Sequence, residues 1–311
     1  MKYSIVFPGQ GSQSLGMLSD LRTNFSVVNE TFQEASDAIN VDLWKIVNEE
    51  QELLNLTENT QPVMLAAGYA TYKVLASEAI LTPISIAGHS LGEYTALVTS
   101  GSLSFFEAVK LVKKRAELMQ TAVPSGSGSM AAILGLDDVK VIEICSIANE
   151  VGVVEAVNFN SPGQVVIAGE KKAVIHACDL MKEAGAKRAL VLPVSVPSHC
   201  SLMKDAAMDF KHSVEAINFK MGREKVLHNV DADYSSNIKE IKSKLVEQLH
   251  KPVLWTSIVQ EMKSSGVEKL IEAGPGKVLA GLTRRIDKSL SGSAIIDVTS
   301  LKSTIEEISN A

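Results

Sequence analysis

The stretch Ile84–Gly92, Ile-Ser-Ile-Ala-Gly-His-Ser-Leu-Gly, runs from a short apolar segment into a turn with two glycines. Ile84–Ala87 has the pattern of a buried strand, and a helix is predicted to follow the turn. In a Gly-x-Ser-x-Gly turn between a strand and a helix, the serine is strained and exposed. The glycines leave room for the backbone around Ser90, and the Leu91 N–H points at the oxyanion that forms when Ser90 attacks a carbonyl. The spacing therefore predicts a serine nucleophile.

Strands and helices alternate on both sides of this turn, which is typical of an α/β fold with a parallel sheet. Residues 2–7 are predicted to form a strand that ends at Pro8–Gln13, Pro-Gly-Gln-Gly-Ser-Gln. Such carboxyl ends of strands are where α/β folds place functional groups. A buried helix is predicted to begin at Pro62, and Ser104 with Glu107 predicts a capping box at the start of another helix.

The middle of the chain follows a different order of elements. Pro124–Ser129 has the composition of a flexible linker. Strands and helices are then predicted in the order strand, helix, strand, strand, helix, strand, at 130–136, 137–149, 153–159, 164–169, 171–185 and 187–193. This order is that of a ferredoxin-like unit. We therefore predict a ferredoxin-like α+β subdomain over 125–194, inserted into a discontinuous α/β core formed by 1–124 and 195–311.

Composition limits the classes of protein that need to be considered. With 311 residues and 46% hydrophobic residues, the chain can build its core without disulfides or a structural metal. Its three cysteines fit neither a disulfide framework nor a zinc motif. A net charge of −6 argues against nucleic acid as a partner. Because no apolar run approaches the roughly 20 residues that span a bilayer, and the N-terminus lacks a signal-peptide core, we expect a cytoplasmic protein without membrane contact.

A serine nucleophile needs a base, and His199 is the strongest candidate among the six histidines. It follows the last predicted strand of the subdomain and the turn Ser195–Ser198, where the chain returns to the core. A capping or structural histidine is the alternative interpretation. No acidic residue between Ser90 and His199 stands out as a third member, so we expect a pair oriented by a neutral acceptor. The neighbouring Cys200 is expected to be buried and inert.

Five motifs, in this order along the chain, are similar to those of the malonyl-CoA:acyl carrier protein transacylase family. They lie at 7–13 (Phe-Pro-Gly-Gln-Gly-Ser-Gln), 88–94 (Gly-His-Ser-Leu-Gly-Glu-Tyr), 157–164 (Val-Asn-Phe-Asn-Ser-Pro-Gly-Gln), 193–199 (Pro-Val-Ser-Val-Pro-Ser-His) and 272–277 (Glu-Ala-Gly-Pro-Gly-Lys). The resemblance extends over nearly the whole chain. It implies an α/β-hydrolase-like core with an inserted ferredoxin-like subdomain, which agrees with the order of elements above.

The resemblance also implies roles for individual residues. Ser90 would be the nucleophile and His199 its base. Gln10 and Leu91 would supply the two backbone N–H donors of an oxyanion hole. The backbone carbonyl of Gln248 would orient His199, which would account for the missing acidic residue.

Arg115 matches the family's arginine that pairs with the free carboxylate of malonate. Taken alone, the run Lys113-Lys114-Arg115 is typical of a solvated charged surface. Helical spacing favours the other interpretation, because Arg115 lies three or four residues from Leu111, Val112, Leu118 and Met119, on the face predicted to point inward.

The implied reaction is a ping-pong transfer of malonyl from malonyl-CoA to holo acyl carrier protein, without metal or cofactor, by a chain that we expect to be a monomer. The carrier protein of this family is acidic, so its docking on an enzyme of charge −6 requires local positive charge. The candidates are Lys187, Arg188, Arg284 and Arg285, although ordinary solvated charges are an equally good interpretation.

Three other functions stay open on the sequence alone. A freestanding acyltransferase that serves a polyketide synthase would share all these motifs. A serine esterase or thioesterase would use Ser90 and His199 with water as the acceptor, and Arg115 would have no special role. A non-catalytic subunit is disfavoured because Ser90, His199 and Gln10 are all present.

Overall fold

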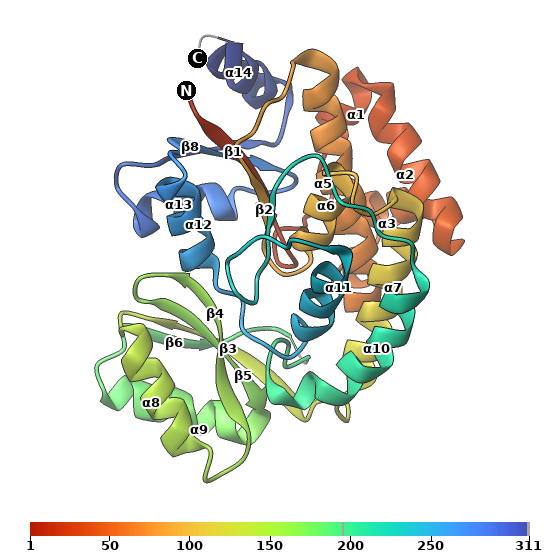
Figure 1. Ribbon diagram of the computed structural model, residues 1–311. Coiled ribbons are helices and arrows are strands. Elements are labelled where there is room, and N and C mark those ends of the chain that lie inside the picture. Colours follow the sequence, from red (N-terminus) through yellow and green to blue (C-terminus); the bar gives the residue numbers. More distant parts are fainter. Residues whose placement is uncertain (195, 310–311) are drawn as a thin grey trace.

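The computed structural model describes residues 1–194 and 196–309, which form a larger parallel sheet, a smaller antiparallel sheet and the helices around them (Figure 1). The strands of the larger sheet are β1 (Tyr3–Phe7), β2 (Ile86–Gly88), β7 (Val226–Leu227), β8 (Lys269–Ala273) and β9 (Ser291–Ile295). They lie in the order β7-β2-β1-β8-β9, and every pair is parallel. Counted along the chain this order is 3-2-1-4-5, as in doubly wound α/β sheets.

Helices cover both faces of the larger sheet. On one face, α5 (Thr57–Glu78), α6 (Gly92–Thr99) and α14 (Val298–Ser309) lie against the strands. The hydrophobic cluster on this face also includes side chains of α1 (Ser19–Asn24), α2 (Ser26–Ile39), α3 (Leu43–Glu49), α4 (Gln51–Asn55), α7 (Phe105–Thr121), α10 (Lys204–Ala216) and α11 (Ile238–Glu247). The other face packs against α12 (Trp255–Ser264) and α13 (Val278–Ile286). None of the helices in the described ranges is long and apolar enough to cross a membrane.

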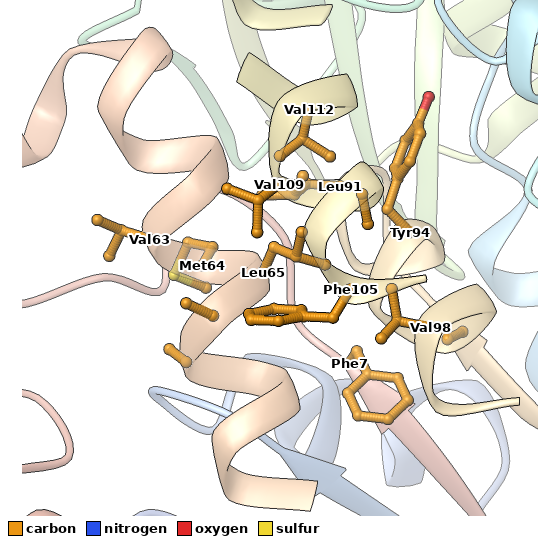
Figure 2. Close-up of a cluster of buried hydrophobic side chains, with 14 of the residues drawn as sticks. Phe7, Val63, Met64, Leu65, Leu91, Tyr94, Val98, Phe105, Val109 and Val112 are labelled. Atoms are coloured by element: carbon orange, nitrogen blue, oxygen red, sulfur yellow. The ribbon is translucent and has the colours of Figure 1, made fainter. Parts of the chain in front are cut away.

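Strand β1 shows why the N-terminal segment is apolar throughout. Ile5 and Phe7 point into the cluster on one face of the sheet and Val6 into the cluster on the other, and all three are fully buried. Strands buried on both faces have continuous apolar sequences. Figure 2 shows the first cluster, in which Phe7 lies below side chains of α5, α6 and α7, with Leu65 and Val109 among them.

The smaller sheet consists of β3 (Gly128–Leu134), β4 (Val154–Ser161), β5 (Gln164–Glu170) and β6 (Arg188–Val191). Its strands are antiparallel, in the order β4-β5-β3-β6. The helices α8 (Asp138–Ala148) and α9 (Lys171–Glu183) pack on one face, which confirms the predicted β-α-β-β-α-β order. Its other face packs around Cys200, beside the larger unit. The exact boundaries of the two domains stay a prediction, and Ser195, at one of them, lies outside the described residues.

Two sequence predictions about element bounds are wrong. Helix α5 begins at Thr57, five residues before the predicted start, and carries Pro62 inside it. The first turn is supported by Asn59 and Thr60, whose N–H groups donate to the carbonyl of Leu56. The predicted strand at 225–230 is only two residues long, β7, because the chain leaves the sheet at His228. The predicted capping box is confirmed, since the side chain of Ser104 accepts from the N–H of Glu107.

Candidate active site

The turn between β2 and α6 holds Ser90 in a left-handed conformation, with φ of 51°. Such a φ costs energy for a residue other than glycine, and that strain was predicted from the motif. The positions on either side, Gly88 and Gly92, must be glycine because there is no room for a Cβ atom. A Cβ on Gly88 would lie 1.8 Å from the carbonyl carbon of Gly92, and a Cβ on Gly92 would lie 2.1 Å from the carbonyl oxygen of Phe7. The turn is therefore pressed against the end of β1.

Ser90, His199 and Gln248 form a connected chain of hydrogen bonds. The Oγ of Ser90 lies 2.8 Å from Nε2 of His199, and Nδ1 of His199 lies 2.6 Å from the backbone oxygen of Gln248. Gln248 is the C-terminal cap of α11, where helix carbonyls lack intrahelical partners and carry partial negative charge. That carbonyl occupies the position of the carboxylate in a Ser-His-Asp triad.

His199 is neutral at physiological pH. Its side chain is 2% exposed, and burial together with the positive charge of Arg115 lowers the pKa of His199 to about 3. Because Nδ1–H donates to the Gln248 oxygen, Nε2 is unprotonated and accepts the hydroxyl proton of Ser90. This is the protonation state that a general base needs before the reaction begins.

Arg115 of α7 lies inside the molecule, on the predicted inward face, and is 1% exposed. Its Nη1 donates to Oε1 of Gln61 at 2.8 Å, and its Nη2 donates to Oε1 of Gln248 at 3.0 Å. The same Nη2 lies 3.4 Å from Oγ of Ser90. A cation therefore stands beside the nucleophile, bonded there to neutral oxygen atoms.

A cavity of about 540 Å³ opens above Ser90, between the larger unit and the smaller sheet. Polar and charged side chains, Gln10, Gln61 and Arg115 among them, line one part of it, and apolar side chains such as Met130 and Leu192 line another. Among the described residues, the backbone N–H groups of Gln10 and Leu91 have no acceptor within the protein. Gln10 lies beside the nucleophile because β1 and the turn touch at Gly9, where a Cβ would be 2.5 Å from the His89 oxygen.

The sequence profile of the acyl transferase domain matches residues 4–303. The chain belongs to this family. Within it, the malonyl CoA-acyl carrier protein transacylase of Haemophilus influenzae is 52% identical over 307 residues, which cover 98% of each chain. The enzyme of that name from Escherichia coli (strain K12) is 49% identical over 306 residues, 98% of this chain and 99% of the relative.

Solved structures of acyl transferase domains have the same fold. An acyl carrier protein S-malonyltransferase from Vibrio cholerae superposes with a TM-score of 0.95 at 52% identity, covering 98% of this chain and all of that one. A malonyl-transacylase in complex with a type II polyketide synthase acyl carrier protein superposes with a TM-score of 0.97 at 49% identity, covering 99% of this chain and 100% of the other. The predicted fold class, α/β with a parallel sheet and an added small antiparallel sheet, is confirmed. In this chain β2, the Ser90 turn and α6 form a strand–turn–helix unit around the serine.

Three polar residues of this acyl transferase domain contact the site but are not predicted from the sequence. Gln61 is bonded to Arg115 as described above. Glu93, in the first turn of α6, is fully buried and accepts from Nε2 of Gln248 at 2.9 Å. Asn229 follows β7, and its Oδ1 accepts from the N–H of Ser90 at 2.7 Å. Glu93 belongs to the Gly88–Tyr94 motif, whereas nothing in the sequence around Asn229 marks it.

Two residues next to the catalytic pair, Cys200 and His89, do not contact the Ser90 hydroxyl in the described structure. Cys200 is buried, and burial raises the pKa of its thiol to about 12, so it is inert as expected. The side chain of His89 is bonded through Nε2 to Oδ1 of Asn160, on β4 of the smaller sheet. In the described part of the chain, no group of three or more His, Cys, Asp or Glu side chains is placed to hold a metal ion.

Proposed function

We propose that the chain transfers a malonyl group from malonyl-CoA to the phosphopantetheine thiol of acyl carrier protein, through a malonyl ester of Ser90. The observation that carries the proposal is the position of Ser90 Oγ, 2.8 Å from a neutral histidine and 3.4 Å from a buried arginine. The first contact suits an attack on a thioester carbonyl. The second suits an acyl group that ends in a carboxylate.

In the first half-reaction, the Ser90 hydroxyl passes its proton to Nε2 of His199 and forms a bond to the thioester carbon. The N–H groups of Gln10 and Leu91 would hold the oxyanion of the tetrahedral intermediate. Its collapse breaks the carbon–sulfur bond, and CoA leaves with the proton from His199. The carbonyl of Gln248 stabilises the imidazolium while it carries that proton.

In the second half-reaction, the thiol of the carrier's phosphopantetheine arm gives its proton to His199 and attacks the ester. The bond between the malonyl carbon and Ser90 Oγ breaks, and Ser90 regains the proton. Both steps use the same groups, so the reaction is reversible and needs no further reagent. Every residue of this machinery comes from one chain, so a monomer is sufficient.

The test measures how malonyl-CoA is consumed with and without holo carrier protein. Without the carrier, we expect one CoA released per enzyme in a rapid burst, followed by little turnover, because water is a poor acceptor for the ester. With the carrier, release should be continuous, with malonyl-carrier protein as the product. A hydrolase would instead release CoA and malonate continuously in the absence of the carrier, which would refute the proposal.

Transfer of malonyl to the carrier protein of a polyketide synthase is a second candidate function, with the same chemistry at Ser90. It is supported by the structural relative that was solved with a type II polyketide synthase acyl carrier protein. The two candidates differ in the carrier protein and not in the site. Comparing rates with carrier proteins from both pathways separates them, since the physiological carrier should have the lower KM.

For the docking of the carrier protein we propose the basic group Lys187, Arg188, Arg284 and Arg285. Gln164 and Arg188 pair with Leu134 from opposite sides, and Arg285 Nη1 donates to the side chain of Gln164 at 3.1 Å. Both pairs of basic residues therefore lie near one end of the smaller sheet. All four are exposed, and an acidic carrier would be attracted to their combined charge.

Replacing Arg188 by glutamate is expected to raise the KM for holo carrier protein about fivefold, because charge reversal at the edge of an interface slows association. Self-acylation of Ser90 by malonyl-CoA should not change. Lys302→Glu is the matched control, since Lys302 is exposed on α14, at the end of the molecule opposite the smaller sheet (Figure 1). An unchanged KM in the Arg188 variant would remove this surface from the proposal.

A further inference from the structure

Arg115 is a buried cation without a carboxylate in contact. In the described part of the chain, its guanidinium bonds to the amide oxygens of Gln61 and Gln248 and approaches the hydroxyl of Ser90. Its Cζ also lies 5.5 Å from the centre of the Tyr94 ring. A buried charge is costly unless an opposite charge compensates it. The empty site therefore needs a counter-charge close by.

Glu93 supplies one, and the side-chain amide of Gln248 separates it from Arg115. The Oε1 of Gln248 accepts from Arg115, and its Nε2 donates to Oε2 of Glu93 at 2.9 Å. Both hydrogen bonds of the Gln248 amide are favourable, because its oxygen faces the cation and its NH₂ group faces the anion. All three side chains are at most 1% exposed, so water does not screen the two charges.

We propose that Glu93 is a specificity-tuning residue, the counter-charge that stabilises Arg115 in the empty site and weakens its hold on the malonyl carboxylate. This inference rests on the proposed function. A negative charge on Glu93 repels the incoming carboxylate across the Gln248 amide. A direct contact between Glu93 and Arg115 would block the guanidinium. With the Gln248 amide between the two charges, the guanidinium stays available to the malonyl carboxylate. The charge of Glu93 still lowers the affinity of the site for malonyl.

Limited affinity suits a transfer enzyme that has to release the same acyl group in the second half-reaction. Interactions that stabilise a bound intermediate as much as the transition state do not accelerate its conversion. If Arg115 had no counter-charge, the malonyl ester of Ser90 would be held more tightly. Glu93 therefore limits the free energy that is needed to release the malonyl group once it has been transferred to the carrier thiol.

Glu93→Gln removes the charge and can keep the hydrogen bonds. Glu93 Oε2 accepts from the N–H of Asn229 and from Gln248, and Oε1 lies 2.7 Å from Nδ1 of His228. The glutamine oxygen can take the first two bonds. Its NH₂ group can donate to Nδ1 of His228 in the tautomer that carries its proton on Nε2, and that Nε2–H then donates to Ser235, 2.9 Å away.

The experiment measures binding without chemistry, by calorimetric titration of Ser90→Ala protein with malonyl-CoA and with acetyl-CoA. Adding Glu93→Gln is expected to lower the Kd of malonyl-CoA about threefold or more, and to change the Kd of acetyl-CoA less than about twofold, since acetyl has no charge to repel. If Glu93 is only structural, both ligands lose affinity together. A higher Kd for malonyl-CoA alone would also overturn the proposal, because Glu93 would then strengthen malonyl binding instead of weakening it.

Glu272→Gln is the matched control. Glu272 is a second fully buried carboxylate, at the end of β8, and accepts from the N–H of Ala280 instead of contacting the site. Burial raises the pKa of Glu272 to about 7, so a neutral side chain is tolerated there. Both Kd values should stay as in Ser90→Ala alone. If Ser90→Ala protein shows no preference for malonyl-CoA, the proposed function fails before Glu93 is tested.

Thermal unfolding tests the counter-charge independently of the reaction. Glu93→Gln should lower Tm in the wild-type background, because Arg115 is left unbalanced. In an Arg115→Met background the same change should leave Tm unaltered or raise it, because it then removes an unbalanced anion. Equal lowering in both backgrounds would mean that Glu93 and Arg115 act separately, and the proposal would be wrong.

Discussion

Replacing His199 by alanine is expected to slow the acylation of Ser90 by malonyl-CoA about a thousandfold. The serine hydroxyl would lose the acceptor that lies 2.8 Å from it, and no other base is bonded to it in the described part of the chain. Rapid-quench mixing followed by intact-protein mass gives the rate. His199→Gln is the matched variant, because it refills the space without supplying a base, and it should be as slow. A loss of less than tenfold in either variant would contradict the role given to His199.

The pH dependence tests the same residue in the wild-type protein. With a pKa of about 3, His199 stays neutral as the pH falls from 8 to 5, so the rate of Ser90 labelling by a fluorophosphonate should be flat over that range. The depressed pKa means that activity is lost only when the pH falls toward that value. A base with the ordinary pKa of about 6.5 would have lost about nine-tenths of its activity at pH 5.5, and that profile would show that burial does not act as described.

Arg115→Ala is expected to reduce malonyl transfer by about two orders of magnitude and to leave acetyl transfer unchanged or improved. A charge-assisted pair with the malonyl carboxylate contributes a few kcal/mol in a desolvated site. Acetyl-CoA lacks that carboxylate, so in the wild-type enzyme it forms no charge-assisted pair with Arg115. The measurement is kcat/KM for both thioesters with holo carrier protein as the acceptor.

Arg115→Lys is the control that separates the effect of the positive charge from that of the planar guanidinium. Lysine keeps the positive charge but lacks the planar fork that binds a carboxylate with two parallel hydrogen bonds. Its malonyl transfer should fall between that of the wild type and that of Arg115→Ala. Equal losses for malonyl and acetyl in the alanine variant would mean that Arg115 supports the fold of the site and does not select the substrate.

The nucleophilic turn could be predicted from sequence because the residues that it requires stand together in one Gly-x-Ser-x-Gly motif between a strand and a helix. Gly88 and Gly92 stand where any Cβ would collide with neighbouring backbone, and Ser90 takes the left-handed conformation that such a turn imposes. The smaller sheet was predictable for a similar reason, since short connections join elements that are neighbours along the chain. Arg115 was singled out by the family resemblance, and helical spacing then predicted that it lies on the inward side of α7.

Other parts of the site depend on contacts between distant segments, and sequence patterns do not record these. The group that orients His199 is a backbone carbonyl, which every residue has, so Gln248 could be named only through the family resemblance. Glu93 and Asn229 meet across 136 positions of the chain. Their neighbours in sequence give no indication of that contact.

The start of α5 shows how one general rule was misleading. Proline is common in the first turn of a helix, so the sequence predicts a start at Pro62. The helix begins one turn and a half earlier, at Thr57, and it tolerates the missing N–H of Pro62 within a fully buried segment. This matters for the site, because Gln61 is thereby fixed on a helix and can hold Arg115.

The most direct test of the central claim is the mass of the intact protein after brief mixing with malonyl-CoA, and again after holo carrier protein is added. We expect one malonyl adduct per chain, located on Ser90 and absent from Ser90→Ala, and we expect this malonyl group to move to the carrier protein. A folded enzyme that transfers malonyl to the carrier while Ser90 is replaced, or that forms its adduct on another residue, would contradict it.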